Sequence, residues 1–254
     1  MAEAQAPITR QIFKDSREFG ARVDVSLQDV DDCFIYDRHG TSVAFKKLYE
    51  NRKSIIIFLR SFLCYTCKEY VDDLSKIPRD VLEEAGVTLV LIGQSAYHHI
   101  EPFSSLTGCP YEIFVDPERC IYRKLGMKTE EEFTMSGTML NEFTPSSNIA
   151  PKHHHAVNIV LLHVWPAHTS PHVKSGIFLG QMKSIWRAMT SPAFDFQGDL
   201  HQQGGAIIAG PGSKVHFCHI SMNRLDHMPI DWLLQLAGVH ETVDFSGRPK
   251  IIHV

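Results

Sequence analysis

Two cysteines separated by two residues, Cys64 and Cys67, are the side chains of this sequence best suited to chemistry. They follow a continuous apolar run at 54–59, which suits a strand buried on both faces, and they precede apolar residues at helical spacing that Pro78 ends. Cys64 is therefore expected at the start of a helix, where unpaired backbone N–H groups and the helix dipole favour a thiolate. Thiols in such C-x-x-C motifs can have pKa values of about 3.5–7.5, against about 8.5 for a free cysteine.

The spacing of the two cysteines also separates their roles. Inside a regular helix, Cβ atoms three residues apart are roughly 5–6 Å from each other, whereas a disulfide needs about 3.5–4.5 Å. The bridge can close only if Cys64 lies at the helix cap, so we expect Cys64 to be an exposed nucleophile and Cys67 a half-buried resolving thiol. Arg60 and Lys68 lie close enough in sequence to stabilise the thiolate further.

Two other uses of the cysteine pair stay open. A zinc half-site would need a second ligand pair at suitable spacing, which the scattered remaining cysteines do not offer. Alternatively, both thiols are inert core residues, as free cysteines often are. Histidine is abundant at 15 residues, with a run at 153–155 followed by His163, His168 and His172, but this segment has no regular period and reads as a solvated loop rather than a metal site.

The remaining cysteines fall into two groups. Cys33, Cys120 and Cys218 lie in or beside apolar segments and are expected to be small buried hydrophobic residues. Cys109 precedes a proline at the end of a loop and is the further thiol of interest.

The order of the expected elements alternates between strands and helices, which indicates an α/β fold containing parallel strands. Two short strands within 33–45 are joined by a turn at 39–40, and a hairpin with a Gly/Pro turn spans 205–218. The other expected strands are 54–59, 87–92 and 111–115, and the helices run from the cysteine motif to 77 and over 98–106, 118–125 and 230–236.

Length and composition set the class of protein. The chain has 254 residues, with 25 Lys and Arg against 29 Asp and Glu, and the net charge of -4 argues against a generic nucleic-acid clamp. We expect a flexible lead at 1–23 and one domain at 24–254, interrupted by an irregular insertion at 129–169 to which we assign no chemistry. The sequence shows no secretory signal and no membrane span, so the expected location is the cytoplasm, where thiols stay reduced.

Several strings in the sequence resemble those of one known family. The segment Phe58-Leu-Arg-Ser-Phe-Leu-Cys-Tyr-Thr-Cys-Lys resembles the strand-to-helix junction of the thioredoxin-like superfamily, and Asp116-Pro-Glu-Arg with the hairpin at 207–215 looks like the AhpC/TSA group. The strings at 63–70, 92–95, 97–101, 186–187, 194–198, 203–205 and 223–227 resemble the peroxiredoxin-like 2 family in particular. The resemblance implies a thioredoxin-like (AhpC/TSA) fold, with a central mixed sheet containing parallel strands, a C-terminal antiparallel hairpin, and helices on both faces.

The same resemblance implies a thiol-dependent redox protein. Cys64 and Cys67 would reduce a peroxide, a lipid endoperoxide or a disulfide, and external thioredoxin or glutathione would restore them, with NADPH used only indirectly. No bound cofactor and no metal is expected. The alternative is a non-catalytic redox-regulatory adaptor in growth or glycolytic signalling, with a signalling protein as its partner.

The sequence departs from the peroxiredoxin pattern around the nucleophile. Counting back from Cys64, Ser61 stands where peroxiredoxins have a threonine, and Ile57 where they have a proline. The run at 202–204, Gln-Gln-Gly, replaces both the peroxiredoxin arginine and the cis-proline of thioredoxins. We therefore expect low peroxidase activity, with Cys64 and Cys67 assisted by Arg60, Ser61 and Thr66. Arg187 and Arg224 are the other arginines that could replace the missing one.

Overall fold

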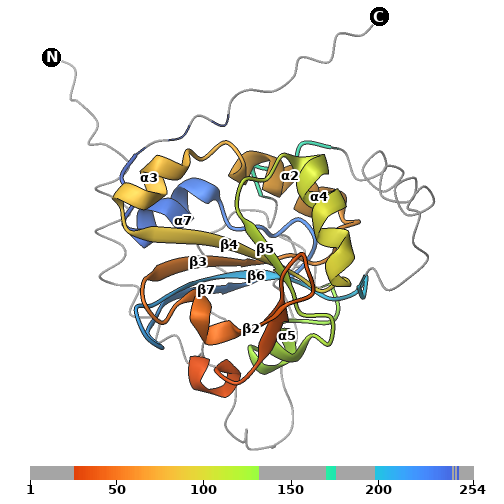
Figure 1. Cartoon of the computed structure of the whole chain (residues 1–254). Coiled ribbons are helices and arrows are strands. Elements are labelled where there is room, and N and C mark those ends of the chain that lie inside the picture. The colour runs from red at the N-terminus through yellow and green to blue at the C-terminus, as the bar shows by residue number, and fades with distance from the viewer. Residues whose placement is uncertain (1–25, 132–169, 176–197, 242, 244, 246–254) are drawn as a thin grey trace, which may run out of the picture. The chain divides into compact units, whose positions relative to one another are not determined.

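The computed structural model describes residues 26–131, 170–175, 198–241, 243 and 245 (Figure 1). All of them belong to one compact unit of the chain. The expected lead at 1–23, residues 132–169 of the expected insertion, and Arg187 lie outside this description. In the described part, no helix is both long enough and apolar enough to cross a bilayer.

Seven strands form one mixed sheet in the order β2-β1-β5-β4-β3-β6-β7. The three central strands run parallel to one another: β3 (Lys53–Phe58), β4 (Val87–Gly93) and β5 (Glu112–Val115). Antiparallel pairs extend the sheet on both sides: β1 (Phe34–Tyr36) with β2 (Ser42–Ala44), and the C-terminal hairpin of β6 (Gly205–Ala209) with β7 (Val215–Ile220). This arrangement confirms the expected mixed sheet with parallel strands and a C-terminal hairpin.

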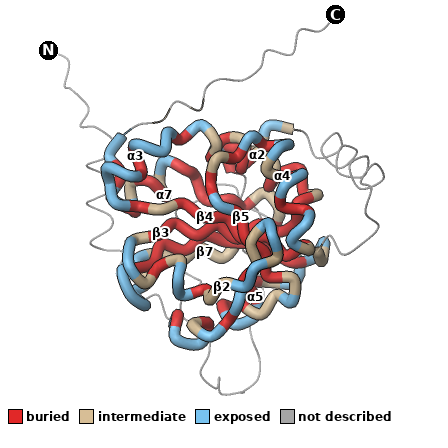
Figure 2. Tube along the Cα trace, in the orientation of Figure 1, coloured by how far each residue is buried: buried red, intermediate tan, exposed pale blue. Residues whose placement is uncertain are grey.

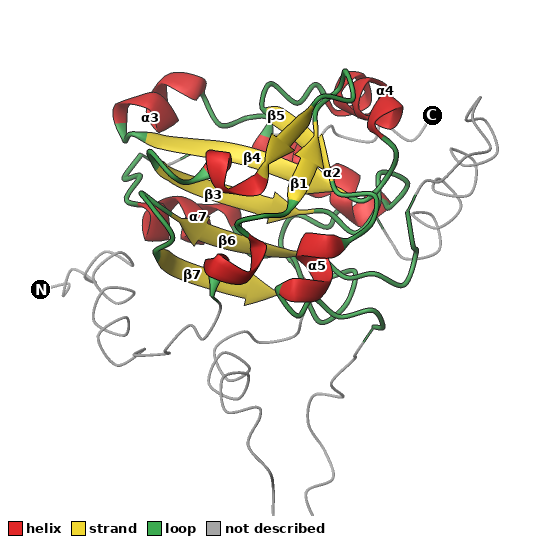
Figure 3. Cartoon of the chain, turned by 60° about the horizontal axis from the view of Figure 1, so that its bottom comes forward, coloured by secondary structure: helices red, strands yellow, loops and turns green. Residues whose placement is uncertain are grey.

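Helices cover both faces of the sheet, as expected (Figures 1 and 3). One face carries α2 (Tyr65–Leu74), α3 (Arg79–Glu84), α4 (Ile100–Thr107) and α7 (Ile230–Ala237). The opposite face carries α5 (Cys120–Lys124) and two 3₁₀ turns, η1 (Leu27–Val30) and η2 (Phe45–Leu48). A third turn, η3 (Tyr97–His99), leads into α4.

Strand β3 supplies side chains to two hydrophobic cores. Ile55 and Ile57 pack under the helices of one face, while Ile56 and Phe58 pack on the other, and all four are buried (Figure 2). Burial of each side chain contributes about 1.5–3 kcal/mol, so the apolar run that the sequence shows is what fixes β3 in the middle of the sheet.

The helices differ from the sequence expectation in their bounds, and one of them was not expected. Helix α2 ends at Leu74 rather than at residue 77, because the Ser75 hydroxyl donates to the Val71 carbonyl at 2.7 Å and the following N–H groups make tighter three-residue turns. The short helix α3 was not expected, since its six residues offer only Val81 and Leu82 to the core. Helix α5 begins at Cys120, two residues after the expected start at 118, and the Asp116 carboxylate accepts its first N–H groups.

A buried ion network fastens residues 170–175 to helix α2. The carboxylate of Asp73 is bonded by His172 Nδ1 at 2.9 Å and by Lys174 Nζ at 2.5 Å. His172 Nε2 accepts the N–H of Ile230 at 3.1 Å, so Nδ1 carries the proton and the ring joins α2 to α7. Burial alone would raise the pKa of Asp73, but the hydrogen bonds from His172 and the lysines hold it below its usual range.

Gly204 is required where the chain enters β6. A Cβ atom at this position would collide with the backbone carbonyl oxygen of Phe58 on β3.

We expect Gly204→Ala to lower the free energy of unfolding by about 2–3 kcal/mol, because backbone atoms have to move apart. Urea unfolding measures the change. Gly212→Ala is the matched control: its Cβ meets nothing within 4 Å, so it should cost only about 1 kcal/mol for its positive φ of 70°. Equal losses in both variants would show that the close approach is not tight.

Candidate active site

The turn from β3 into α2 presents Cys64 at the edge of the sheet. Leu59 continues the ladder by donating to the Ile92 carbonyl at 2.8 Å. The chain then bends, with the Ser61 carbonyl accepting the N–H of Cys64 at 3.1 Å and the Ser61 hydroxyl accepting that of Leu63 at 3.2 Å. Cys64 is the N-cap residue of α2, in an extended conformation, as the spacing argument requires. Ser61 therefore shapes the turn that carries the nucleophile.

Both thiols are more buried than the sequence suggested. Cys64 is only 8% exposed and Cys67 is fully buried, so the expectation of an exposed nucleophile beside a half-buried partner is wrong. The reason is tertiary: both sulfurs belong to the core beneath the helices, and residues near position 200 lie beside the same turn. Both cysteines are free thiols in this structure.

Arg60 extends a buried guanidinium beside the Cys64 sulfur. Its Nη1 lies 3.3 Å from Cys64 Sγ, its Nε donates to Gln203 Oε1 at 2.9 Å, and its Nη2 donates to the Leu200 carbonyl at 2.7 Å. The side chain of Arg60 is only 7% exposed. Gln203 belongs to the run that stands in place of the usual peroxiredoxin arginine, so here it holds the guanidinium of Arg60 instead of supplying one.

Glu131 joins two arginines at the site. Its carboxylate lies 3.1 Å from Arg60 Nη2 and 2.8 Å from Arg224 Nη2. Burial would raise the pKa of Glu131, but the hydrogen bond from Arg224 and the charge of Arg60 lower it, so the carboxylate is ionised. Glu131 lies in the segment from 129 to which the sequence analysis assigned no chemistry, and it contacts the two arginines of the site. Arg224 reaches the site through Glu131, whereas Arg60 contacts the sulfur itself.

The pKa values of the two thiols are shifted in opposite directions. A hydrogen bond from Cys67 holds the pKa of Cys64 well below its usual value despite burial, and the Arg60 charge and the Thr66 hydroxyl add to this effect. The backbone N–H of Cys67 also lowers the pKa of Cys64, but less than the side chains just named. The Cys64 sulfur makes no regular capping hydrogen bond to the helix. Burial and the neighbouring sulfur raise the pKa of Cys67 well above its usual value. The direction of the two shifts agrees with the expected order of the thiols, and the side chains of Cys67, Arg60 and Thr66 act on Cys64 in addition to its place at the start of the helix.

Thr66, which the sequence analysis expected at the site, pairs there with His227, which the sequence analysis missed. Thr66 Oγ1 lies 3.0 Å from Cys64 Sγ and 3.4 Å from His227 Nε2. The His227 ring stacks on Tyr70 with centroids 4.8 Å apart, and burial lowers its pKa to about 4, so the ring is neutral at pH 7. The sequence offered a lone histidine 161 positions from Thr66, and no local pattern connects the two.

The other expected sites lie apart from the cysteine pair. Cys109 is buried, and burial raises the pKa of its thiol. Cys33 is buried as expected, whereas Cys120 and Cys218 are only partly buried. Among the described residues, no group of three or more His, Cys, Asp or Glu side chains could hold a metal ion. His172, the one described histidine of the His-rich segment, belongs to the network around Asp73.

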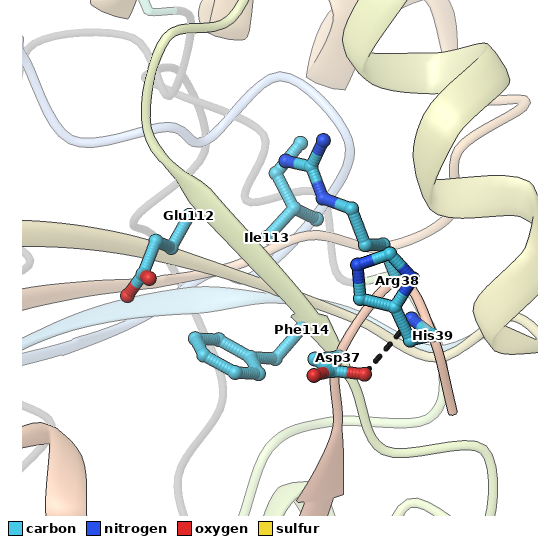
Figure 4. A pocket seen from close by; sticks show the side chains of 6 residues that line it. All are labelled: Asp37, Arg38, His39, Glu112, Ile113 and Phe114. Carbon is cyan, nitrogen blue, oxygen red and sulfur yellow. Dashed lines mark hydrogen bonds between the residues drawn. The ribbon is translucent and has the colours of Figure 1, made fainter. Parts of the chain in front are cut away.

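A pocket of about 200 Å³ lies away from the dithiol, next to β1 and β5 (Figure 4). It is lined by Asp37, Arg38, His39, Glu112, Ile113 and Phe114. Neither cysteine of the pair nor Arg60 lines it, so this pocket is separate from the candidate site.

A strand that a short turn connects to a helix beginning at a C-x-x-C motif, in a mixed sheet with helices on both faces, defines a protein of the thioredoxin-like fold. The family model for the AhpC/TSA antioxidant enzymes matches residues 73–223. The chain therefore belongs to the AhpC/TSA antioxidant enzyme family. The matched residues begin after Cys67, so the role of the dithiol has to be argued from its geometry.

Individual relatives agree with this assignment. The chain is 60% identical to Peroxiredoxin-like 2C of Takifugu rubripes over 100% of both chains, and 44% identical to Peroxiredoxin-like 2C of Homo sapiens over 99% of both. It is 24% identical to a protein named Prostamide/prostaglandin F synthase of Aquarana catesbeiana, over 83% of this chain and 87% of that one. Reduced Prx3 from Vibrio vulnificus, solved in complex with H2O2, shares the fold with a TM-score of 0.50 at 9% identity, covering 84% of this chain and 97% of that one.

The contact between Arg60 and the sulfur predicts the ionisation of the thiol. In a Cys67→Ser background, Arg60→Met should slow alkylation of Cys64 at pH 7 about tenfold, because the neighbouring positive charge is lost. The rate of iodoacetamide alkylation measured against pH tests this. Lys68→Met is the control: its ammonium is paired with Asp72 at 2.6 Å, and the rate should not change. Equal rates in both variants would mean that Arg60 does not stabilise the thiolate.

The buried neutral ring of His227 predicts a dependence of stability on pH. Its pKa of about 4 in the folded protein lies below the ordinary value of 6.5, so the unfolded chain binds more protons between these two values. This histidine's contribution should therefore fall as the pH falls through that window, by about 2 kcal/mol between pH 7 and pH 5. Urea unfolding at both pH values should show this extra loss in the natural sequence but not in His227→Gln. The same loss in both proteins would assign it to other groups.

Proposed function

We propose that this protein is a thiol-dependent oxidoreductase that reduces a peroxide, a lipid endoperoxide or a disulfide through Cys64 and Cys67. The observation that carries the proposal is the buried Arg60 guanidinium, 3.3 Å from the Cys64 sulfur. A fixed positive charge in a water-poor site keeps the neighbouring thiol ionised. The same charge can stabilise the negative charge that a substrate develops during the reaction.

In the first step, the Cys64 thiolate attacks one peroxide oxygen. A sulfur–oxygen bond forms, the O–O bond breaks, and the second oxygen leaves as hydroxide or alkoxide, which takes a proton from water. With hydrogen peroxide or a hydroperoxide, Cys64 becomes a sulfenic acid; with an endoperoxide, in which both oxygens carry carbon, it becomes a sulfenate ester that still holds the opened substrate. In each case the O–O bond is reduced by two electrons. Arg60 Nη1 and the Thr66 hydroxyl lie 3.3 and 3.0 Å from the Cys64 sulfur, so they are the donors that we expect to stabilise the charge on the leaving oxygen.

In the second step, Cys67 attacks the oxidised Cys64 sulfur. A disulfide forms, and the oxygen on Cys64 takes the proton of the Cys67 thiol and leaves as water, or as the substrate alcohol when the substrate is an endoperoxide. The raised pKa of Cys67 keeps that proton in place while Cys64 is still a thiolate, so the resolving thiol does not compete for the substrate. With a disulfide substrate, Cys64 forms a mixed disulfide and Cys67 displaces the second sulfur in the same way.

An external thiol reductant then reduces the disulfide between Cys64 and Cys67 back to two thiols. Thioredoxin supplies two thiols in one molecule and glutathione supplies one thiol from each of two molecules, and NADPH enters only through their reductases. Such reductants belong to a reducing compartment such as the cytoplasm. The name of the relative from Aquarana catesbeiana suggests a lipid with an O–O bond as one substrate class for this chain.

The test is turnover of purified protein with thioredoxin, thioredoxin reductase and NADPH. Hydrogen peroxide, a lipid hydroperoxide, a lipid endoperoxide and a model disulfide are compared. Cys64→Ser should abolish NADPH consumption with every substrate, and Cys67→Ser should allow at most one turnover per protein. Cys109→Ser, which removes a buried thiol that lies elsewhere, is the control and should retain activity.

Arg60→Met separates peroxide reduction from disulfide exchange in the same assay. Loss of one well-placed donor should lower the peroxide rate by about 10²–10³, while disulfide exchange, which depends mainly on the thiolate, falls less. Arg60→Lys should recover part of the loss, since it keeps the charge without the planar fork. Absence of reaction with all four substrates in the natural sequence would overturn the proposal and favour the non-catalytic redox-regulatory adaptor.

A further inference from the structure

A second pair of cysteines meets on the sheet face opposite the C-x-x-C motif. Cys33 lies between η1 and β1, and Cys120 is the first residue of α5. Their sulfurs are 3.2 Å apart although the residues are 87 positions apart in sequence. Both pack into the core formed with η1, η2 and α5, whereas Cys64 and Cys67 belong to the core beneath α2.

The backbone around this second pair is already fixed. The N–H of Cys33 donates to the Val30 carbonyl at 3.0 Å, and its own carbonyl accepts from Phe45 at 2.9 Å. On the other side, the N–H of Cys120 donates to Asp116 at 3.0 Å. Because sulfurs in a disulfide are about 2.05 Å apart, bonding requires an approach of only about 1.2 Å, which side-chain rotation can supply.

We propose that Cys33 and Cys120 form a second dithiol, independent of the C-x-x-C pair, which low-molecular-weight disulfides of the glutathione class convert into a disulfide. This inference does not rest on the proposed function, since neither sulfur contacts the Cys64 site. The reaction consumes one glutathione disulfide and releases two glutathione thiols.

Cys120 reacts first, because it is partly exposed while Cys33 is only 4% exposed. The Cys120 sulfur attacks one sulfur of glutathione disulfide and displaces the first glutathione. The Cys33 sulfur then attacks Cys120 and displaces the second, so the two protons of the protein thiols end on the two glutathione thiols. Burial and the neighbouring Cys120 raise the pKa of Cys33 to about 11, so its contribution depends on proximity rather than on ready ionisation.

The disulfide would be a covalent cross-link that stabilises the fold. It would enclose all the strands from β1 to β5 together with the C-x-x-C helix. Closing a loop of this length restricts the unfolded chain, so the oxidised protein should melt at a higher temperature than the reduced one, by roughly 5 °C or more. The attachment of α5 to η1, where Lys124 Nζ donates to the Asp29 carbonyl at 2.7 Å, lies next to the bridge.

The experiment uses the full chain carrying Cys64→Ser and Cys67→Ser, so that the first dithiol cannot contribute. The protein is equilibrated in glutathione buffers of increasing oxidised fraction, alkylated, and digested with trypsin without reduction. The expected product is a linked pair of peptides, 23–38 with 120–123, together with the rise in melting temperature. Thiols that stay alkylated in every buffer, or Cys120 found only as a glutathione adduct, would overturn the proposal.

Single substitutions assign the bridge within that background. Cys33→Ala and Cys120→Ala should each remove the linked peptides and the rise in melting temperature. Cys218→Ala, in the same core on β7, should retain both. If Cys33→Ala fails to fold, the partly exposed Cys120→Ala still decides the result. With the C-x-x-C pair restored, Cys120→Ala should leave thioredoxin-dependent turnover unchanged, and a loss of turnover would contradict the independence of the two dithiols.

Discussion

The buried guanidinium of Arg60 is the interaction on which the rest of the site depends. Taking such an ion out of water costs several kcal/mol unless it is paired and hydrogen-bonded. Its partners come from distant parts of the chain: the Gln203 amide and the Leu200 carbonyl before β6, Glu131 after α5, and the Cys64 sulfur at the start of α2. Because a thiolate compensates the charge better than a thiol, the stability of this cluster and the ionisation of the nucleophile are coupled.

The same cluster gives two chemically identical thiols different pKa values. Cys64 faces the guanidinium and the Thr66 hydroxyl, whereas Cys67, one helical turn further, lies fully inside the core. Burial therefore favours the protonated form of Cys67, and its thiol stabilises the charge on Cys64. Packing, rather than the C-x-x-C motif by itself, sets the order in which the sulfurs would react.

The run at 202–204 has no arginine, yet a guanidinium lies beside the Cys64 sulfur in this chain. It belongs to Arg60, which follows the end of β3, and Gln203 Oε1 accepts a hydrogen bond from its Nε. Glu131 offsets part of the positive charge and draws Arg224 to the site. A guanidinium shared between a sulfur and a carboxylate has less charge to offer a peroxide, which is a physical reason to expect modest peroxide reduction.

The sequence by itself determined the elements whose signals are local. The apolar run of β3, the Gly/Pro turn of the hairpin and the helix start at Cys64 follow from periodicity and turn residues, and together they gave an α/β order with parallel strands, a hairpin and the place of the dithiol. The mixed sheet with helices on both faces was what the resemblance to the thioredoxin-like superfamily implied. Only the tertiary structure decided which side chains meet. Gln203 lies 143 positions from Arg60, His227 lies 161 from Thr66, and Cys120 lies 87 from Cys33. Such contacts arise because the sheet places β6 beside β3, and because the chain after β5 packs against η1. No pattern within a short stretch of sequence shows that arrangement. The burial of Cys64 has the same origin, since residues distant in sequence complete the surroundings of the thiol.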